Sequence, residues 1–114
     1  MIVRHMNRSY TRQEAEAEIR DEGLHEMVFE VPAVDNEPHW HDFDACLYLL
    51  EGTLRLRDVA AGVVHECAPG MRIDVPAKTV HAEQSDGYTV LLGCTRDPAT
   101  FDENLNRPPE TLTS

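Results

Sequence analysis

The chain has 114 residues, which is enough for one domain with a single core and too few for two. Its 21 acidic and 10 basic residues give a formal net charge of −11 at pH 7, so we expect neither nucleic acid nor an anionic membrane surface as a partner. No run approaches the roughly 20 apolar residues of a membrane span or resembles a secretory signal, and we therefore expect a cytoplasmic protein.

The N-terminal segment, residues 1–26, contains one expected helix. Residues 11–14 have the T-x-x-E form of a capping box, and Gly23 supplies a stop signal, so the pattern predicts a short helix near residues 11–22. Its one strongly apolar residue is Ile19, with Ala15 one turn earlier on the same face. Because these two residues give the helix little apolar surface to bury, we expect it to lie on the surface of a larger domain.

From residue 27 to residue 95 the chain consists of short apolar runs split by turn residues. Residues 53–57 alternate leucine with arginine, which is typical of a half-buried strand. The other expected strands are at 27–33, 45–52, 63–67, 71–75, 79–84 and 88–94. Many short strands at regular spacing predict a sandwich or a barrel. Residues 96–114 are polar, contain three prolines and predict a flexible tail.

Three histidines carry the clearest chemical meaning. His39 and His41 are two residues apart, and on a strand such residues project from the same face. His81 comes from another expected strand and completes a set of three imidazoles that suits one divalent metal ion. A three-histidine set leaves coordination positions open for a substrate.

Around these histidines the chain resembles the two motifs of the cupin superfamily, written G-x5-H-x-H-x3/4-E-x6-G and G-x5-P-x-G-x2-H-x3-N. The matching residues are His39, His41 and Gly52 in the first motif and Gly70, Pro76 and His81 in the second. The departing residues are Ala33, Ala45, Lys78 and Ser85. The resemblance covers roughly residues 27–94. It implies an all-β fold: a single cupin-type β-barrel, a jelly-roll-like double-stranded β-helix, with the short N-terminal helix on its flank.

The resemblance also implies that His39, His41 and His81 are metal ligands. Fe²⁺ is the leading ion, and Zn²⁺, Ni²⁺, Mn²⁺ and Cu²⁺ stay open. Ala45 stands where the family carries an acidic ligand, so the full +2 charge is uncompensated and the centre should favour anionic or chelating ligands. Asp44, one residue earlier, is expected to face solvent or to support a ligand, and a bulge that makes it a fourth ligand stays open.

Several other side chains are candidates for the pocket. Tyr48, Cys46 and His65 are the possible pocket residues, although Cys46 fits core packing better, as all three cysteines do. Tyr88 could form part of the pocket wall or supply a phenol for acid–base chemistry. Trp40 is expected on the opposite face of the strand from His39 and His41, so we expect it to be a packing residue. The alternation places Arg55, Arg57 and Arg72 outward, which argues against an anion pocket built from the barrel wall.

These observations favour a metal-dependent enzyme that acts on a small polar organic molecule. Dioxygenase-type chemistry leads, and isomerase, lyase or decarboxylase chemistry follows. The alternative is a non-catalytic small-molecule-binding or sensor cupin, because the sequence gives no sure general acid or base beside the histidines. Since small cupins commonly pair, we also expect a homodimer, with the apolar strand 45–50 and the helix as the surface that a second protomer could bury.

Overall fold

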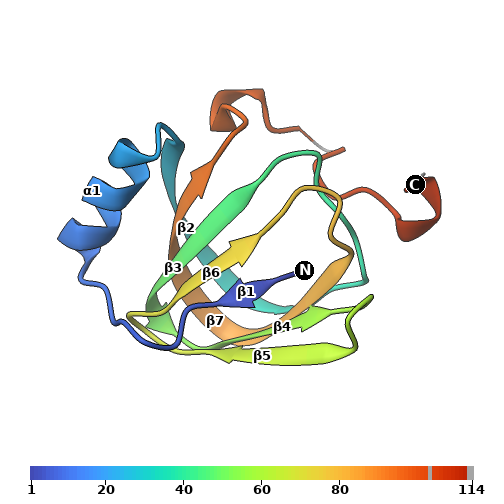
Figure 1. Ribbon diagram of the computed structural model, residues 1–114. Helices are drawn as coiled ribbons and strands as arrows, with labels where there is room; N and C mark the ends of the chain where they lie inside the picture. Colours follow the sequence, from blue (N-terminus) through green and yellow to red (C-terminus); the bar gives the residue numbers. More distant parts are fainter. Residues whose placement is uncertain (103, 113–114) are drawn as a thin grey trace.

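The strands curl into a nearly closed β-barrel, and one helix lies against the outside of its wall (Figure 1). This computed structural model describes residues 1–102 and 104–112. The elements are β1 (Val3–Arg4), α1 (Arg12–Asp21), β2 (His25–Asp35), β3 (Ala45–Gly52), β4 (Leu54–Asp58), β5 (Val63–Cys67), β6 (Arg72–Val75), β7 (His81–Cys94) and two 3₁₀ turns, η1 (Pro98–Thr100) and η2 (Pro109–Thr111). The all-β class and the flanking helix are as the sequence predicts.

Strand β7 organises the barrel because it pairs with three other strands. Its first residues pair with β4, its second half pairs with β3, and its other edge pairs with β2. The sequence predicts two strands here, separated at Gly87, whereas the structure has one continuous strand. Gly87 has φ 132° and lies against Gly52 of β3. A Cβ atom on Gly52 would be only 2.3 Å from the carbonyl oxygen of Gly87. The glycines therefore mark a close approach of β3 and β7 and not a chain break.

The barrel interior is apolar and follows the alternation of the sequence. On β4, Leu54 and Leu56 are buried while Arg55 and Arg57 are exposed. The largest buried cluster joins Ile2, just before β1, with residues of β3, β4, β5, β6 and β7. At one side Asp58 is buried and accepts hydrogen bonds from the backbone N–H groups of Ile2 and Ala61, so the N-terminal strand is tied to the turn after β4.

Helix α1 packs on the outer face of β3 and β7. It begins with the expected capping box, in which Thr11 and Glu14 bond to each other's backbone N–H groups. Ile19 is 0 % exposed and packs with Cys46 and Tyr48. Gly93 permits this contact, since a Cβ atom there would lie 2.8 Å from Cys46 Sγ and 2.9 Å from Ile19 Cγ1.

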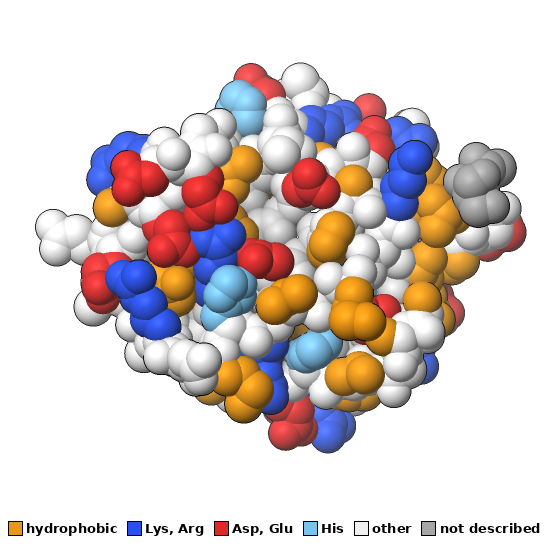
Figure 2. All heavy atoms as spheres, in the orientation of Figure 1, with side chains coloured by type: hydrophobic (Ala, Val, Ile, Leu, Met, Phe, Trp, Pro, Cys, Tyr) orange, Lys and Arg blue, Asp and Glu red, His pale blue; other side chains and the backbone are white. Residues whose placement is uncertain are grey.

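Arg72 is buried at 8 % exposure, although the alternation of the sequence correctly places it on the outer side of the barrel wall. It does point away from the barrel interior, but the helix covers it. The guanidinium donates to Glu18 of the helix, to Glu22 at its C-cap and to Asp74 of its own strand. It also donates to the hydroxyl of Tyr48. Figure 2 shows acidic and basic side chains intermixed over this part of the surface. No helix in the described ranges is long and apolar enough to cross a membrane.

The chain after β7 folds back over one end of the barrel (Figure 1), whereas the sequence predicts a flexible tail. Arg107 pairs with Trp40 through two backbone hydrogen bonds of 3.0 Å, and Trp40 Nε1 donates to the Pro108 carbonyl. Trp40 is thus a packing residue, as its position between the two inward-facing histidines predicts. Asp42 forms ion pairs with Arg96 and Arg107. The described part of the tail is therefore a component of the site end of the barrel.

Candidate metal centre

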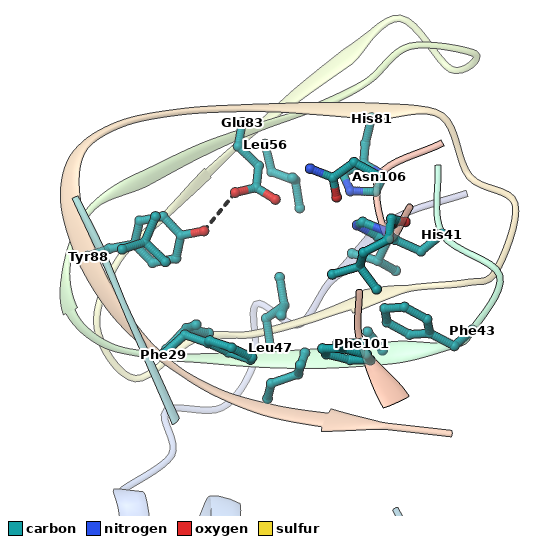
Figure 3. Close-up of a pocket in the computed structure, with 16 residues that line it drawn as sticks. Phe29, His41, Phe43, Leu47, Leu56, His81, Glu83, Tyr88, Phe101 and Asn106 are labelled. Carbon is teal, nitrogen blue, oxygen red and sulfur yellow. Dashed lines mark hydrogen bonds between the residues drawn. The ribbon is translucent and has the colours of Figure 1, made fainter. Parts of the chain in front are cut away.

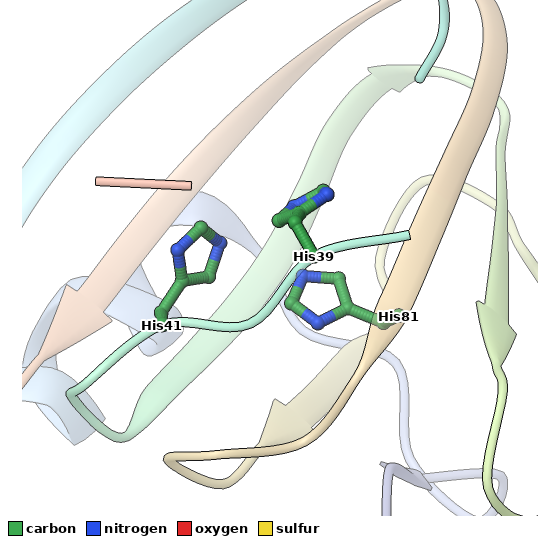
Figure 4. Close-up of side chains that lie close together, drawn as sticks. All are labelled: His39, His41 and His81. Carbon is green, nitrogen blue, oxygen red and sulfur yellow. The ribbon is translucent and has the colours of Figure 1, made fainter. Parts of the chain in front are cut away.

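Backbone pairing brings the three histidines together. His39 and His81 face each other in an antiparallel bridge, with N···O distances of 2.9 and 2.8 Å. Residues directly opposite in such a pair present their side chains to the same face. His41 follows two residues later, and the candidate donor atoms of all three lie within 4.8 Å of one another (Figure 4). The ring centroids are 4.5 to 5.0 Å apart.

Each imidazole is oriented by a hydrogen bond to a backbone carbonyl. His39 Nδ1 bonds to Glu37 O at 2.8 Å, His41 Nδ1 to Leu105 O at 2.9 Å, and His81 Nδ1 to Thr79 O at 2.8 Å. A carbonyl oxygen only accepts, so Nδ1 carries the proton in all three rings and the Nε2 lone pairs are left for a ligand. Histidines that bind metals are held in this way. A tetrahedral ion with bonds of about 2.0–2.1 Å needs donors about 3.4 Å apart, which small ring movements supply. The donor set fits a divalent ion.

Burial favours the neutral imidazole form of His41 and His81. His39 is only 5 % exposed and His81 only 3 % exposed. Burial disfavours the imidazolium and lowers the pKa of His81 to about 4, and it lowers the pKa of His41 as well. Because neutral imidazole is the form that binds a metal, the site is prepared for one before the ion arrives.

A cavity of about 220 Å³ opens beside the centre, inside the barrel (Figure 3). Its polar lining consists of His41, His81, Glu83, Tyr88 and Asn106. Its aromatic lining consists of Phe29, Phe43 and Phe101, and the remaining lining residues are aliphatic. Ala45 is among these, so the position of the missing acidic ligand does point inward but carries only a methyl group.

Asp44 lies outside the histidine cluster. Its Oδ1 accepts a 2.7 Å hydrogen bond from Ala77 N, and its own backbone N–H donates to Thr95 Oγ1 at 3.1 Å. Asp44 therefore ties the loop before β3 to the turn after β6. In the described structure it does not take the position of a fourth ligand, which the sequence left open.

The other pocket candidates do not line the cavity. Strand β3 alternates, so Ala45 and Leu47 face the cavity while Cys46 and Tyr48 face α1. Cys46 is a core residue, as the sequence favours, and Tyr48 does not line this cavity. The Tyr48 hydroxyl donates to Glu18, and burial raises the pKa of Cys46 to about 11, which leaves an unreactive thiol. His65 lies on β5 opposite Leu56 but is not a lining residue of the cavity either.

The structure adds site residues that the sequence reasoning missed. Glu83 follows His81 by two residues on the same strand, so strand parity alone could have placed it on the cavity side. Its Oε2 accepts a 2.7 Å hydrogen bond from the Tyr88 hydroxyl. Phe101 and Asn106 come from the tail, where no periodic pattern predicts an inward direction.

Solved structures share this architecture. An RmlC-like cupin from Shewanella frigidimarina matches with a TM-score of 0.52 at 17% identity, over 68% of this chain and 73% of that one. The chain has the cupin fold. A DUF861 family protein from Thermotoga maritima matches with a TM-score of 0.58 at 14% identity, over 81% of this chain and 97% of that one.

The ribosomal oxygenase YcfD from Escherichia coli, in complex with cobalt and succinic acid, matches with a TM-score of 0.55 at 19% identity. That match covers 77% of this chain but only 29% of YcfD, so the likeness concerns the barrel and not the whole oxygenase. No family model and no curated protein matches the sequence. At these identities the shared property is the cupin fold.

Proposed function

We propose that this small cupin binds a divalent metal ion through His39, His41 and His81 and acts there on a small organic molecule held in the barrel cavity. One observation carries the proposal: each of the three rings places a candidate donor nitrogen within 4.8 Å of the others, and the three Nδ1–carbonyl hydrogen bonds leave the Nε2 lone pairs free. Fe²⁺ with dioxygenase-type chemistry leads, and isomerase, lyase or decarboxylase chemistry on Zn²⁺, Ni²⁺, Mn²⁺ or Cu²⁺ follows. The cobalt complex of the structurally similar YcfD supports a divalent ion in a barrel of this kind.

A bound divalent ion supplies a Lewis acid, and a redox centre where it is iron. The protein supplies the surroundings. The aromatic and aliphatic lining excludes water from the cavity and strengthens polar contacts within it. Glu83 supplies a proton acceptor whose direction is fixed by the Tyr88 hydroxyl, while burial raises the pKa of Tyr88 and keeps its proton in place. The sequence reasoning gave no such group beside the histidines.

The alternative function is a non-catalytic binding or sensor cupin, and the composition of the cavity favours it. Most of the lining is apolar, and Ala45 offers no charge to the centre. Such a cavity could hold a ligand tightly without changing it. Oxygen uptake by the iron-loaded protein separates dioxygenase chemistry from binding alone, because a binding module consumes no oxygen with any compound that it holds. Conversion of the compound without oxygen uptake would indicate isomerase, lyase or decarboxylase chemistry instead.

Metal content per chain tests the proposal directly. Protein purified without a histidine tag and loaded with the ion should hold about one metal, and His39→Ala, His41→Ala and His81→Ala should each lose most of it, since two imidazoles hold a labile ion poorly. His65→Ala is the matched control and should keep the full content, because His65 lies outside the cluster. Full occupancy in the double variant His41→Ala, His81→Ala would disprove the site.

A further inference from the structure

The cavity has two chemically different sides. In Figure 3, Glu83, Asn106 and His81 lie along one side together with Leu56, while Phe29, Leu47 and Phe101 lie along the opposite one. Tyr88 stands at one end beside Glu83, and His41 and Phe43 stand at the other. A ligand that satisfies both sides is flat, apolar on its faces and polar along one edge. An aromatic ring with polar substituents has this form.

Charge sets a second condition on the ligand. Of the described residues that line the cavity, Glu83 is the only Asp, Glu, Lys or Arg. The arginines of the neighbouring strand β4, Arg55 and Arg57, are exposed on the outer face of the barrel. An anionic group at the Tyr88 end would therefore meet a carboxylate and no cation, in surroundings of low dielectric constant. This end of the cavity disfavours anions.

The carboxylate of Glu83 offers one free direction for hydrogen bonding. Tyr88 donates to Oε2, and among the described residues none donates to Oε1. Glu83 is only partly buried, and its side chain points into the cavity (Figure 3). A neutral hydroxyl or amide N–H on the ligand would complete this site, because an ionised carboxylate only accepts hydrogen bonds.

The volume limits the size of the ligand. An apolar cavity of about 150 Å³ holds one benzene molecule, so on this scale about 220 Å³ holds on the order of ten non-hydrogen atoms. One six-membered ring with a few small substituents fits, whereas a compound of three fused rings does not.

We propose that the cavity selects a compact single-ring aromatic compound with chelating oxygens at the His41 and His81 end and a neutral hydrogen-bond donor, never a carboxylate, facing Glu83. The chelating edge rests on the metal centre of the proposed function. The ring and the donor rest on Phe29, Phe101 and Glu83 alone. Glu83 is thus the residue that determines specificity at the end away from the metal.

Calorimetric titration of zinc-loaded protein tests the charge rule, because zinc has no redox chemistry that would consume the probe. The probes are 3,4-dihydroxybenzamide and 3,4-dihydroxybenzoate, which have the same ring, the same chelating pair and nearly the same size. We expect the amide to bind at least roughly tenfold more tightly, since the acid places an unpaired charge against Glu83. Equal affinity, or tighter binding of the acid, would overturn the proposal.

The variant Glu83→Gln assigns the discrimination to this residue. Glutamine keeps an acceptor for Tyr88 but removes the charge, so the ratio between amide and acid should fall to within about threefold. A ratio unchanged from the wild type, in a variant whose circular dichroism spectrum is native, would show that Glu83 does not select. The wild-type ratio tests the charge rule even if this variant fails to fold.

A second pair of probes tests the aromatic side. Benzohydroxamate and acetohydroxamate chelate zinc identically but differ by the phenyl ring, whose burial should strengthen binding by roughly tenfold or more. No gain from the ring would overturn the aromatic assignment.

Zinc content is measured on each sample before titration, so failure of the metal centre is recognised separately. If no zinc is retained, the same preferences for the ring and the amide are expected at lower affinity in metal-free protein, measured from changes in amide NMR shifts of cavity residues. Their absence there would overturn the inference as well.

Discussion

Asp44 and Ala45 are neighbours with opposite roles, and the alternation of β3 separates them. Ala45 faces the cavity where a cupin acid would stand, and Asp44 faces the loop, where it accepts a hydrogen bond from Ala77 N. The carboxylate nearest in sequence to the vacant ligand position is therefore engaged elsewhere. Three neutral imidazoles leave the +2 charge of a bound ion uncompensated, which favours chelating oxygens that carry negative charge.

Replacing Asp44 by asparagine should leave metal binding almost unchanged. The amide oxygen of asparagine can still accept from Ala77 N, so the turn after β6 stays in place. Metal affinity measured by competition with a chromogenic chelator should change by less than about threefold, whereas loss of a ligand or its support costs about 10- to 100-fold. A loss of that larger size would show that Asp44 moves in to coordinate the ion.

Single residues also show how far the sequence could predict this site. Strand parity and the cupin motifs brought out His39, His41 and His81, and the structure places them together. The alternation of β3 also places Tyr48 outside the cavity, because it lies three residues from the inward-facing Ala45 and therefore on the opposite face. Glu83 was within reach of the same argument. Asn106 was not, because its position depends on contacts with a segment more than sixty residues away.

At the level of elements, the position of α1 against the sheet depends on Gly93, a residue without a side chain. Gly93 lies where a methyl group would approach both Cys46 Sγ and Ile19 Cγ1 within 3 Å. The helix itself carries little apolar surface beyond Ala15 and Ile19, so a small displacement costs much of its anchorage. Arg72 adds a second attachment through Glu18 and Glu22.

The variant Gly93→Ala should lower the free energy of unfolding by about 1–3 kcal/mol, the usual cost of overpacking. Urea denaturation measures it. Ile19→Ala alone should also destabilise, because it removes the main apolar contact of the helix. The double variant should lose less than the sum of the two, since removal of the isoleucine makes room for the new methyl group. Strict additivity would mean that α1 does not depend on Gly93.

The tail is the element whose role the sequence predicts least well. Its polar composition indicates a flexible segment, yet Leu105 O orients His41, and Phe101 and Asn106 line the cavity. Local patterns predicted the helix and most strands to within one or two residues, because capping boxes and alternation are local. The tail is held by contacts with residues near position 40, which no local pattern contains.

Ending the chain after Thr100 should therefore weaken metal binding. Without Leu105, His41 Nδ1 loses its carbonyl partner, and an affinity loss of about 10-fold or more is expected. The matched control ends after Leu112 and keeps every described contact of the tail. Chelator competition on both chains measures the difference. Equal affinities would show that the carbonyl does not orient the ligand.

For the whole molecule, the homodimer stays a prediction, but strand 45–50, one part of the surface expected for it, is not accessible. Strand β3 is paired on both edges, with β6 and β7, and α1 covers its outer face. Exposed hydrophobic residues are found instead near the N-terminus and on β5: Met1, Val3, Met6, Val63 and Val64. Figure 2 shows hydrophobic side chains gathered around the N-terminus. A partner would have to use a surface other than strand 45–50.

The stability of the whole metal-free molecule should fall with acid over a defined window. The pKa of His81 is lowered by burial from 6.5 to about 4, and that of His41 is lowered as well. Between these values the unfolded chain binds protons that the folded chain does not, so stability is complete above about pH 6.5 and declines towards about pH 4. Each histidine contributes up to roughly 1.4 kcal/mol per pH unit within its window.

Urea unfolding of the metal-free protein at about pH 7.5, 6.5, 5.5 and 4.5 measures this decline, since these values bracket the histidine window. Carboxylates with lowered pKa values, such as Asp58 and Glu18, also lose stabilisation in acid, but only below their ordinary values near 4. The variant His81→Gln separates the two effects, because glutamine does not titrate and its curve should be flatter between pH 6.5 and 4.5. Parallel curves for the wild type and His81→Gln would mean that His81 is accessible to protons in the folded state, contrary to its burial at the start of β7, where it pairs with His39.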